Sequence, residues 1–296
     1  MSEKTLRLAL YCLVGVTALY VAVTFLRGGG NGSVAADSDL AEAFGEMAGE
    51  SQTHFDITGP RDTVRLARDV DGWTVNGFEA DSGAVSRFLR AVDEVEIASV
   101  AATNPANHGR LGVTADSAWA VASGDGPTVL LGKTGNRFRT AYARLPDDDL
   151  VSLIEGDLRA AAARPLLDWR DKMILRVDTA AVAGITVVRD GEAVTFQRQD
   201  SVWTGADGEA DATTVRNIRQ ELANMRASGF APEDAELPDE PERTVVALDA
   251  DGTELASLAL SEGDGNFRVT SADSPYIFEI PTFRANRVAP GPPDEG

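Results

Sequence analysis

Apolar and polar residues alternate in the stretch TVRLARDVDGWTV (residues 63–75), where one polar residue separates Val64 from Leu66. Alternation of this kind is typical of a strand with one buried face. From residue 82 the apolar side chains instead recur every three or four positions, which predicts an amphipathic helix. Asp81 directly precedes this run and can cap the helix by accepting N–H groups of its first turn. The apolar positions of the predicted helix are Val85, Phe88, Leu89, Val92 and Val95.

The same pattern returns 130 residues later along the chain. Trp73 and Asp81 of the first pattern correspond at this spacing to Trp203 and Asp211 of the second. A strand, a tryptophan, a cap and a helix at one fixed spacing indicate an internal duplication. The apolar pairs at the same spacing are Val64 and Val194, Leu66 and Phe196, Val85 and Val215, Phe88 and Ile218, Val92 and Leu222, and Val95 and Met225.

Further strand-like segments follow each predicted helix. In the first unit they read AWAVAS, TVLLG and FRTAYARL, joined by segments rich in Gly and Asp. In the second unit, RTVVALDADGTELASLAL predicts a hairpin with its turn at Asp251-Gly252. The sequence therefore predicts the α+β class, with two duplicated units that each pack a helix on an antiparallel sheet, behind one N-terminal transmembrane helix.

Shifts in composition divide the chain into six segments. The glycine-rich RGGGNGS is typical of a flexible tether, and the terminal APGPPDEG is typical of a disordered tail. Trp169 and Ile174 lie between the two units, where they are candidates for burial at the junction. The predicted segments are a cytoplasmic tail and membrane anchor at 1–27, a tether and short helix at 28–50, the first α+β unit at 51–164, a connector at 165–181, the second α+β unit at 182–284, and the disordered tail at 285–296.

Residues 8–26, LALYCLVGVTALYVAVTFL, contain no charged side chain. About 20 apolar residues are needed to cross the hydrocarbon layer of a membrane as a helix. Lys4 and Arg7 precede the run, so we expect a single-pass inner-membrane protein with a cytoplasmic N-terminus and a periplasmic ectodomain. The alternative is a signal peptide cleaved near Ala36, although an apolar run of this length exceeds the about 7–15 residues usual for a signal.

Charge and cysteine content exclude several classes of function. The net charge is −20, and residues 1–27 carry +2 of it, so residues 28–296 carry −22. A surface this acidic repels phosphate backbones, so no nucleic-acid partner is expected. Cys12 is the single cysteine and lies inside the apolar run, which excludes a disulfide framework and thiol chemistry in the outer part.

The segment LLGKTGN (130–136) contains the triplet Gly132-Lys133-Thr134, which is shared with phosphate-binding loops. The full loop pattern requires a glycine five residues before Gly132, and Pro127 stands there. No helical pattern follows that would offer its N-terminus to a phosphate. The triplet is therefore interpreted as a β-turn between two strands.

Other candidate chemistry also lacks the required pattern. The segments 249–254 (DADGTE) and 207–211 (DGEAD) lack the 12-residue register of a calcium loop and are interpreted as turns and a helix cap. His54 and His108 have no serine in a GxSxG elbow with which to build a hydrolytic triad. The sequence therefore predicts no catalytic, cofactor-binding or metal-binding residue, and a hydrolase is the least favoured class.

The order of these segments resembles a bacterial family known as domain of unknown function, number 4340. The resemblance lies in VRLARDVDGWTV followed by EADSGAVSRFLRAV, in HGRLGV followed by TVLLGKTGNRFRTAYARL, and in the link LLDWRDKMI, and it covers most of residues 51–284. It implies a membrane-anchored protein that faces the periplasm and has ABC-type permease and auxiliary subunits as partners. The expected function is a non-catalytic accessory or scaffold protein of an envelope transport system. The alternative is a periplasmic ligand- or glycan-binding module.

Overall fold

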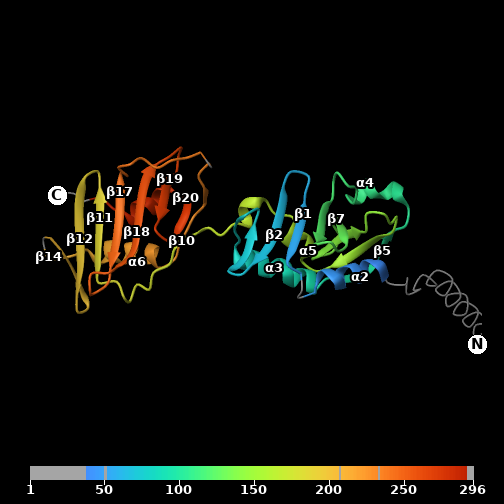
Figure 1. Ribbon diagram of the computed structural model, residues 1–296, viewed down its shortest axis with the longest axis horizontal. Helices are drawn as coiled ribbons and strands as arrows, with labels where there is room; N and C mark the ends of the chain where they lie inside the picture. Colours follow the sequence, from blue (N-terminus) through green and yellow to red (C-terminus); the bar gives the residue numbers. More distant parts are fainter. Residues whose placement is uncertain (1–37, 50–51, 207, 233, 292–296) are drawn as a thin grey trace, which may run out of the picture. The chain divides into compact units, whose positions relative to one another are not determined.

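The computed structural model divides the chain into two compact units, with the boundary between Arg170 and Asp171 (Figure 1). The predicted anchor at 8–26 lies outside the described residues. Within the ranges that are described, no helix has both the length and the apolar character needed to span a membrane. The structure describes residues 38–49, 52–206, 208–232 and 234–291.

The first unit contains a nine-stranded antiparallel sheet with the strand order β4-β3-β2-β1-β6-β7-β8-β9-β5. Its strands are β1 (His54–Thr58), β2 (Thr63–Asp69), β3 (Gly72–Val75), β4 (Phe78–Glu79), β5 (Glu96–Ala102), β6 (Trp119–Ser123), β7 (Thr128–Thr134), β8 (Thr140–Arg144) and β9 (Val151–Glu155). Its helices are α2 (Ser38–Met47), α3 (Ser82–Asp93), η1 (Pro105–Asn107), α4 (His108–Leu111), α5 (Leu158–Ala162) and η2 (Leu166–Asp168).

The second unit contains another nine-stranded antiparallel sheet, with the order β14-β13-β12-β11-β17-β18-β19-β20-β16, and a separate pair formed by β10 and β15. Its strands are β10 (Met173–Leu175), β11 (Gly184–Arg189), β12 (Glu192–Gln199), β13 (Val202–Gly205), β14 (Gly208–Glu209), β15 (Met225–Arg226), β16 (Gly229–Phe230), β17 (Arg243–Leu248), β18 (Glu254–Glu262), β19 (Phe267–Ser271) and β20 (Ser274–Ile280). Its helices are α6 (Ala212–Ala223) and α7 (Thr282–Val288).

The two sheets have the same strand order. In each, four consecutive strands form one half, the helix after the fourth strand leads to the opposite edge, and four further strands complete the sheet. Helix α3 therefore corresponds to α6, and β1 corresponds to β11. Residues 130 apart in the sequence occupy equivalent places in these elements.

The predicted α+β class is wrong, because the described residues are mainly β: 41% lie in strands and 22% in helices. The antiparallel pairing of the strands agrees with the prediction, and each of the two large sheets has nine strands. Strands such as β4 and β14 are two residues long. Alternation of apolar and polar residues cannot be recognised over so short a segment. The shortest strands were therefore missed, and the one long helix of each unit was given too much weight in the predicted fold class.

Aspartate caps begin the equivalent helices, as predicted. An Asp81 side-chain oxygen accepts a hydrogen bond from the Ala84 N–H at 2.7 Å. An Asp211 side-chain oxygen accepts from the Thr214 N–H, also at 2.7 Å. Each bond satisfies an N–H group that has no partner inside the first turn, so both helices begin at a fixed residue.

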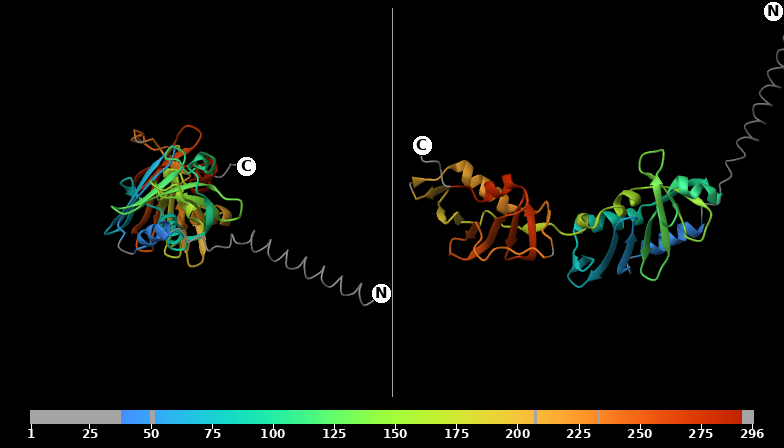
Figure 2. Two further views of the ribbon diagram at one scale, coloured as in Figure 1. Left: turned by 90° about the vertical axis from the view of Figure 1, so that its right-hand side faces the viewer. Right: turned by 90° about the horizontal axis from the view of Figure 1, so that it is seen from above.

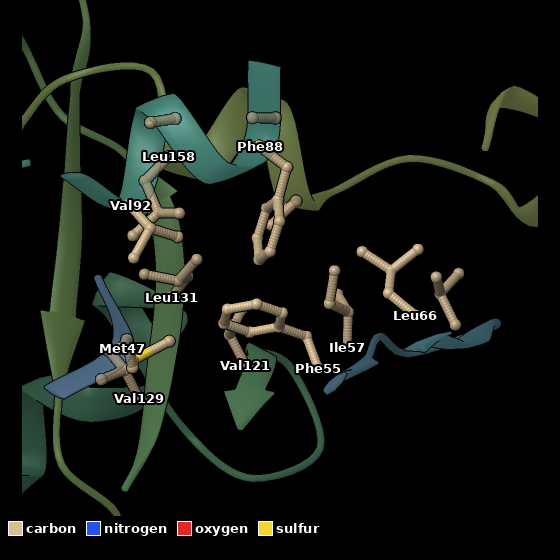
Figure 3. Packing of buried hydrophobic residues seen from close by; sticks show 14 of the residues in the cluster. Met47, Phe55, Ile57, Leu66, Phe88, Val92, Val121, Val129, Leu131 and Leu158 are labelled. Atoms are coloured by element: carbon tan, nitrogen blue, oxygen red, sulfur yellow. The ribbon is translucent and has the colours of Figure 1, made fainter. Parts of the chain in front are cut away.

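The core of the first unit lies between the sheet and helices α2, α3 and α5 (Figure 3). Phe88 of α3 points toward the sheet, where its ring meets Phe55 edge-on at a centroid distance of 5.1 Å. Its other neighbour is Trp169, at 5.6 Å and also edge-on. All three side chains are fully buried, so this aromatic cluster fixes α3 against β1.

The core of the second unit is formed by the sheet and both α6 and α7, which lie on the same face (Figure 2, right). Ala285 and Val288 of α7 are fully buried in it, so the unit continues past residue 284, where the predicted tail begins. The predicted connector 165–181 is shared between the two units. Trp169 belongs to the core of the first unit and Ile174 to that of the second.

Candidate functional site

The triplet Gly132-Lys133-Thr134 lies within strand β7, so its interpretation as a turn is wrong. The space beside Gly132 is filled, because an added Cβ would lie 2.5 Å from the Leu111 carbonyl oxygen. Lys133 donates a hydrogen bond to the Arg110 carbonyl oxygen at 3.0 Å. These backbone contacts explain the small residue and the lysine without a phosphate.

The segment 249–254 contains the predicted turn and Asp211 is the predicted helix cap, but Gly208 and Glu209 form strand β14. In the hairpin between β17 and β18, the Asp249 carboxylate accepts hydrogen bonds from the N–H groups of Asp251 and Thr253. Gly252 takes the left-handed conformation there, with φ of 84°. Across the described ranges, no group of three or more His, Cys, Asp or Glu side chains is placed to hold a metal ion.

The two histidines occupy separate elements of the first unit. His54 begins β1, and His108 begins α4. The Nε2 of His108 lies 3.0 Å from the Asp149 carbonyl oxygen, and its side chain is buried. His108 therefore connects α4 to the loop between β8 and β9, which is a structural role.

Within the described residues of the second unit, helices α6 and α7 both pack on one face of the sheet, and the other face carries no helix of this unit. Side chains that alternate with the core positions of β11, β12, β17, β18 and β19 lie on this face, which we call the neutral face. Register places nine of them in two rows across the strands, and no member of these two rows is charged, whereas Arg268 of β19 lies beside the rows, opposite Ser261; the name neutral face refers to the two rows alone. The rows are Ala193, Val188, Thr244, Ala259 and Thr270, and Thr195, Thr186, Val246 and Ser257.

The neutral face consists of small and β-branched side chains that are partly or fully exposed. Thr186 and Thr195 lie directly opposite each other on β11 and β12, with 3.3 Å between their hydroxyl oxygens. The chain as a whole has a net charge of −20. Because depletion of charge is typical of the centre of a protein interface, this face is a candidate interaction surface.

The equivalent face of the first sheet is different. Helix α4 and the residues after it cover part of this face, where Leu111 and Val113 pack against Val151. Elsewhere on the face, Asp56 of β1 forms a two-pronged ion pair with Arg65 of β2, the shorter contact being 2.7 Å. This pair corresponds at the 130-residue spacing to the Thr186–Thr195 pair of the second unit.

A groove of about 440 Å³ lies beside helices α3 and α5 in the first unit. We call it the arginine groove, because four guanidinium groups line it together with two carboxylates. Arg87, Arg90 and Glu94 come from α3 and its C-terminus, and Asp157 precedes α5. The remaining two members are Arg139, before β8, and Arg164, after α5.

The charges of the arginine groove are only partly paired. Arg139 donates to Asp157 at 2.8 Å. Arg164 makes a long hydrogen bond of 3.5 Å to the Ala160 carbonyl oxygen in the preceding helix α5. Its pKa is lowered, first by burial and then by the positive charge of Arg87. Among the described residues, neither Arg87 nor Arg90 forms an ion pair.

The second unit has a carboxylate at the equivalent position. Glu221 of α6 is buried and accepts a hydrogen bond from Arg284 Nε of α7 at 2.9 Å. Arg287, also of α7, lies 3.4 Å from the other carboxylate oxygen. At the 130-residue spacing, Glu221 corresponds to Ala91, which lines the arginine groove. The second unit therefore pairs Arg284 and Arg287 with a carboxylate of its own long helix, whereas the long helix of the first unit has alanine at that position.

Neither the neutral face nor the arginine groove is marked by a sequence motif. Both could have been found by comparing the polar positions of the two predicted units at the 130-residue spacing. That comparison pairs Ala91 with Glu221 and Arg90 with Gln220. Periodicity draws attention to the apolar positions, which are similar in both units, and so overlooks the differences between them.

Comparison with curated proteins found no match, and comparison with solved structures found none. The model of one protein family, described as Domain of unknown function (DUF4340), matches residues 73–245. The match begins at Trp73 in β3 and ends at Val245 in β17, so it takes in parts of both units. Since the match covers more than half of the sequence, the chain belongs to the DUF4340 family.

Proposed function

We propose that the protein is a non-catalytic accessory or scaffold protein, anchored in the inner membrane, of an ABC-type envelope transport system. The neutral face of the second sheet would bind a membrane-protein partner on the periplasmic side. The observation that supports this proposal most directly is the absence of charge from both rows of this face, in a chain of net charge −20. The ABC-type partner is proposed from the sequence resemblance.

The uncharged residues 8–26 support the membrane attachment, because their number is close to that needed to cross the hydrocarbon layer. The tether and both units would then lie on the periplasmic side. A duplicated unit supports a scaffold role, since two copies of one sheet extend the protein and allow different surfaces to evolve on each. The Asp56–Arg65 and Thr186–Thr195 pairs are such a difference.

We propose that the partner binds the face of the second sheet and not an edge. The edges of this sheet expose few unpaired backbone groups. The edge strands β14 and β16 are only two residues long. A short edge strand presents few unpaired N–H and C=O groups to another strand, so edge pairing is disfavoured. The neutral face spans five strands and has no such restriction.

The proposal is tested by co-purification of the full-length, C-terminally tagged protein from crosslinked membranes. We expect a permease and an ATPase to be recovered. The double substitution Thr186→Asp and Thr195→Arg places the ion pair of the first unit on the neutral face and is expected to reduce their recovery. The matched control, Asp56→Thr and Arg65→Thr, makes the reverse exchange in the first unit and should leave recovery unchanged. Recovery of the unsubstituted protein alone would contradict the proposal.

The alternative function is ligand binding in the periplasm, and the arginine groove is the observation that favours it. A ligand-binding module would retain this groove as its principal site. Loss of the permease on substitution of the neutral face separates the two functions, because the groove and the neutral face belong to different units.

A further inference from the structure

The arginine groove gathers positive charge in a strongly acidic protein. Its lining contains four guanidinium groups and two carboxylates, Glu94 and Asp157, so positive charge exceeds negative charge by two among the lining residues, and Asp168 and Asp81 act on Arg164 from outside the lining. Arg87 and Arg90 are one turn apart on α3, so their charges repel each other along the helix. This repulsion lowers the stability of the folded protein. Such an arrangement is therefore expected where an anionic ligand compensates the repulsion.

The second unit shows which chemical group binds arginine side chains at the equivalent position, namely a carboxylate. Arg284 and Arg287 of α7 converge on the Glu221 carboxylate, which α6 supplies. In the first unit, Ala91 takes the place of this carboxylate, and α3 carries Arg87 and Arg90 where α6 carries Asn217 and Gln220. The first groove therefore lacks the internal anion and has additional donors around its position.

Guanidinium groups bind carboxylates and phosphates through two parallel hydrogen bonds. We propose that the arginine groove binds a compact oxyanion, a carboxylate or phosphate group, between Arg87, Arg90 and Arg164. Arg139 closes one end of the site and is held there by its ion pair with Asp157. The ligand oxyanion takes the position that the Glu221 carboxylate occupies in the second unit.

A second groove, of about 380 Å³, adjoins the first and limits which ligands fit. The two share Glu94 and Arg139, and the second is also lined by Glu96, Glu155 and Phe138. Three glutamates disfavour further negative charge there. The exposed Phe138 ring offers an apolar surface at the same place. The preferred ligand therefore carries a single oxyanionic group, and the rest of it is not anionic.

The test is a titration of the full-length protein with inorganic phosphate and with acetate, followed by calorimetry against sodium chloride of equal ionic strength. We expect binding of at least one oxyanion above the chloride baseline. The stronger of the two distinguishes a phosphate-bearing from a carboxylate-bearing natural ligand. If neither binds more strongly than chloride, the proposal is wrong.

Three variants locate the site. Arg87→Gln and Arg90→Gln lie on the exposed side of α3, and each is expected to weaken binding about tenfold to a hundredfold. Ala91→Glu supplies the carboxylate of the second unit and is expected to abolish binding. The matched control, Arg61→Gln, removes an exposed arginine from the turn between β1 and β2 and should not change affinity. Unchanged affinity in both Arg87→Gln and Arg90→Gln would overturn the assignment.

Discussion

Ala91 and Glu221 occupy the same position in two equivalent helices, each ten residues after its capping aspartate. Glu221 is buried and pairs with two arginines of α7, whereas Ala91 leaves the arginines beside it without that partner. The two units therefore share a fold and differ in the charge of the groove next to their long helix. In the second unit an internal ion pair occupies this place, whereas the arginine groove of the first unit is suited to an external anion.

Replacing Glu221 with Ala is expected to lower the free energy of unfolding of the second unit by about 3 kcal/mol. Removal of one partner of a buried ion pair leaves the other charge without compensation, which costs on this order. Urea unfolding measures the effect, and the transition of the first unit should not move. Glu209→Ala is the control, since it removes an exposed glutamate of β14 in the same unit. An equal effect of the two substitutions would show that the ion pair contributes little.

Replacing Phe88 with Ala is expected to destabilise the first unit by about 3–5 kcal/mol. The substitution removes two aromatic contacts and leaves a cavity between α3 and the sheet. Phe138→Ala is the control, because that side chain is 90% exposed and packs against no core. Tryptophan fluorescence during unfolding reports the change through Trp169, which contacts Phe88. A cost below that of Phe138→Ala would contradict the packing described.

The cap of α6 predicts a loss of stability in acid. The Asp211 carboxylate accepts hydrogen bonds from Thr214, first from its side-chain hydroxyl and then from its backbone N–H, and these bonds lower the pKa of Asp211 below its usual value. A carboxyl group with a lowered folded pKa contributes stability above its unfolded pKa of about 3.9, and that contribution is lost as the pH falls through the folded value. Asp211→Asn retains a capping oxygen without titrating.

The measurement for this prediction is the unfolding of both forms of the protein as the pH is lowered from neutral to strongly acidic values. The difference in stability between the natural protein and Asp211→Asn should be constant near neutral pH and shrink in acid. A difference that grows as the pH falls would contradict the assigned role of the cap.

The double substitution Thr186→Asp and Thr195→Arg is expected to leave the second unit folded. Asp56 and Arg65 occupy the equivalent positions of the first sheet, where they form an exposed ion pair across the strands. Exposed pairs contribute about 0–1 kcal/mol, so the free energy of unfolding should change by no more than about 1 kcal/mol. Circular dichroism during thermal unfolding checks this. A large loss would mean that the hydroxyl pair is required for the sheet itself.

The elements that sequence analysis predicted correctly are those with a repeated local signal. Asp81 and Asp211 stand before runs with helical spacing, and both cap a helix in the structure. The hairpin at Asp251-Gly252 is also present, because its turn chemistry is local. The strand count was not predictable in the same way. β4 and β14 exist because neighbouring strands pair with them, and two residues carry no period.

The two candidate surfaces, like the short strands, are formed only by tertiary contacts between segments that are separate in the sequence. Arg87 and Arg164 are far apart in the sequence, and only the packing of α3 beside α5 brings them to one groove. The neutral face requires the register of several strands, since Val246 and Thr186 become neighbours only through pairing of β11 with β17. Gly132 looked like part of a turn, but it lies in strand β7, which pairs with β6 and β8, and it is glycine because its neighbours leave no room for a side chain.

The measurement that tests the proposed function most directly is site-specific photocrosslinking in intact membranes. A photoreactive residue is placed at Val246, in the middle of the neutral face, and in a separate variant at Arg216, on the exposed side of α6. The proposed function predicts a crosslink from position 246 to a membrane-embedded permease and none from position 216. A permease crosslink from position 216 alone, or none from either, would contradict the assignment of the neutral face as the partner-binding surface.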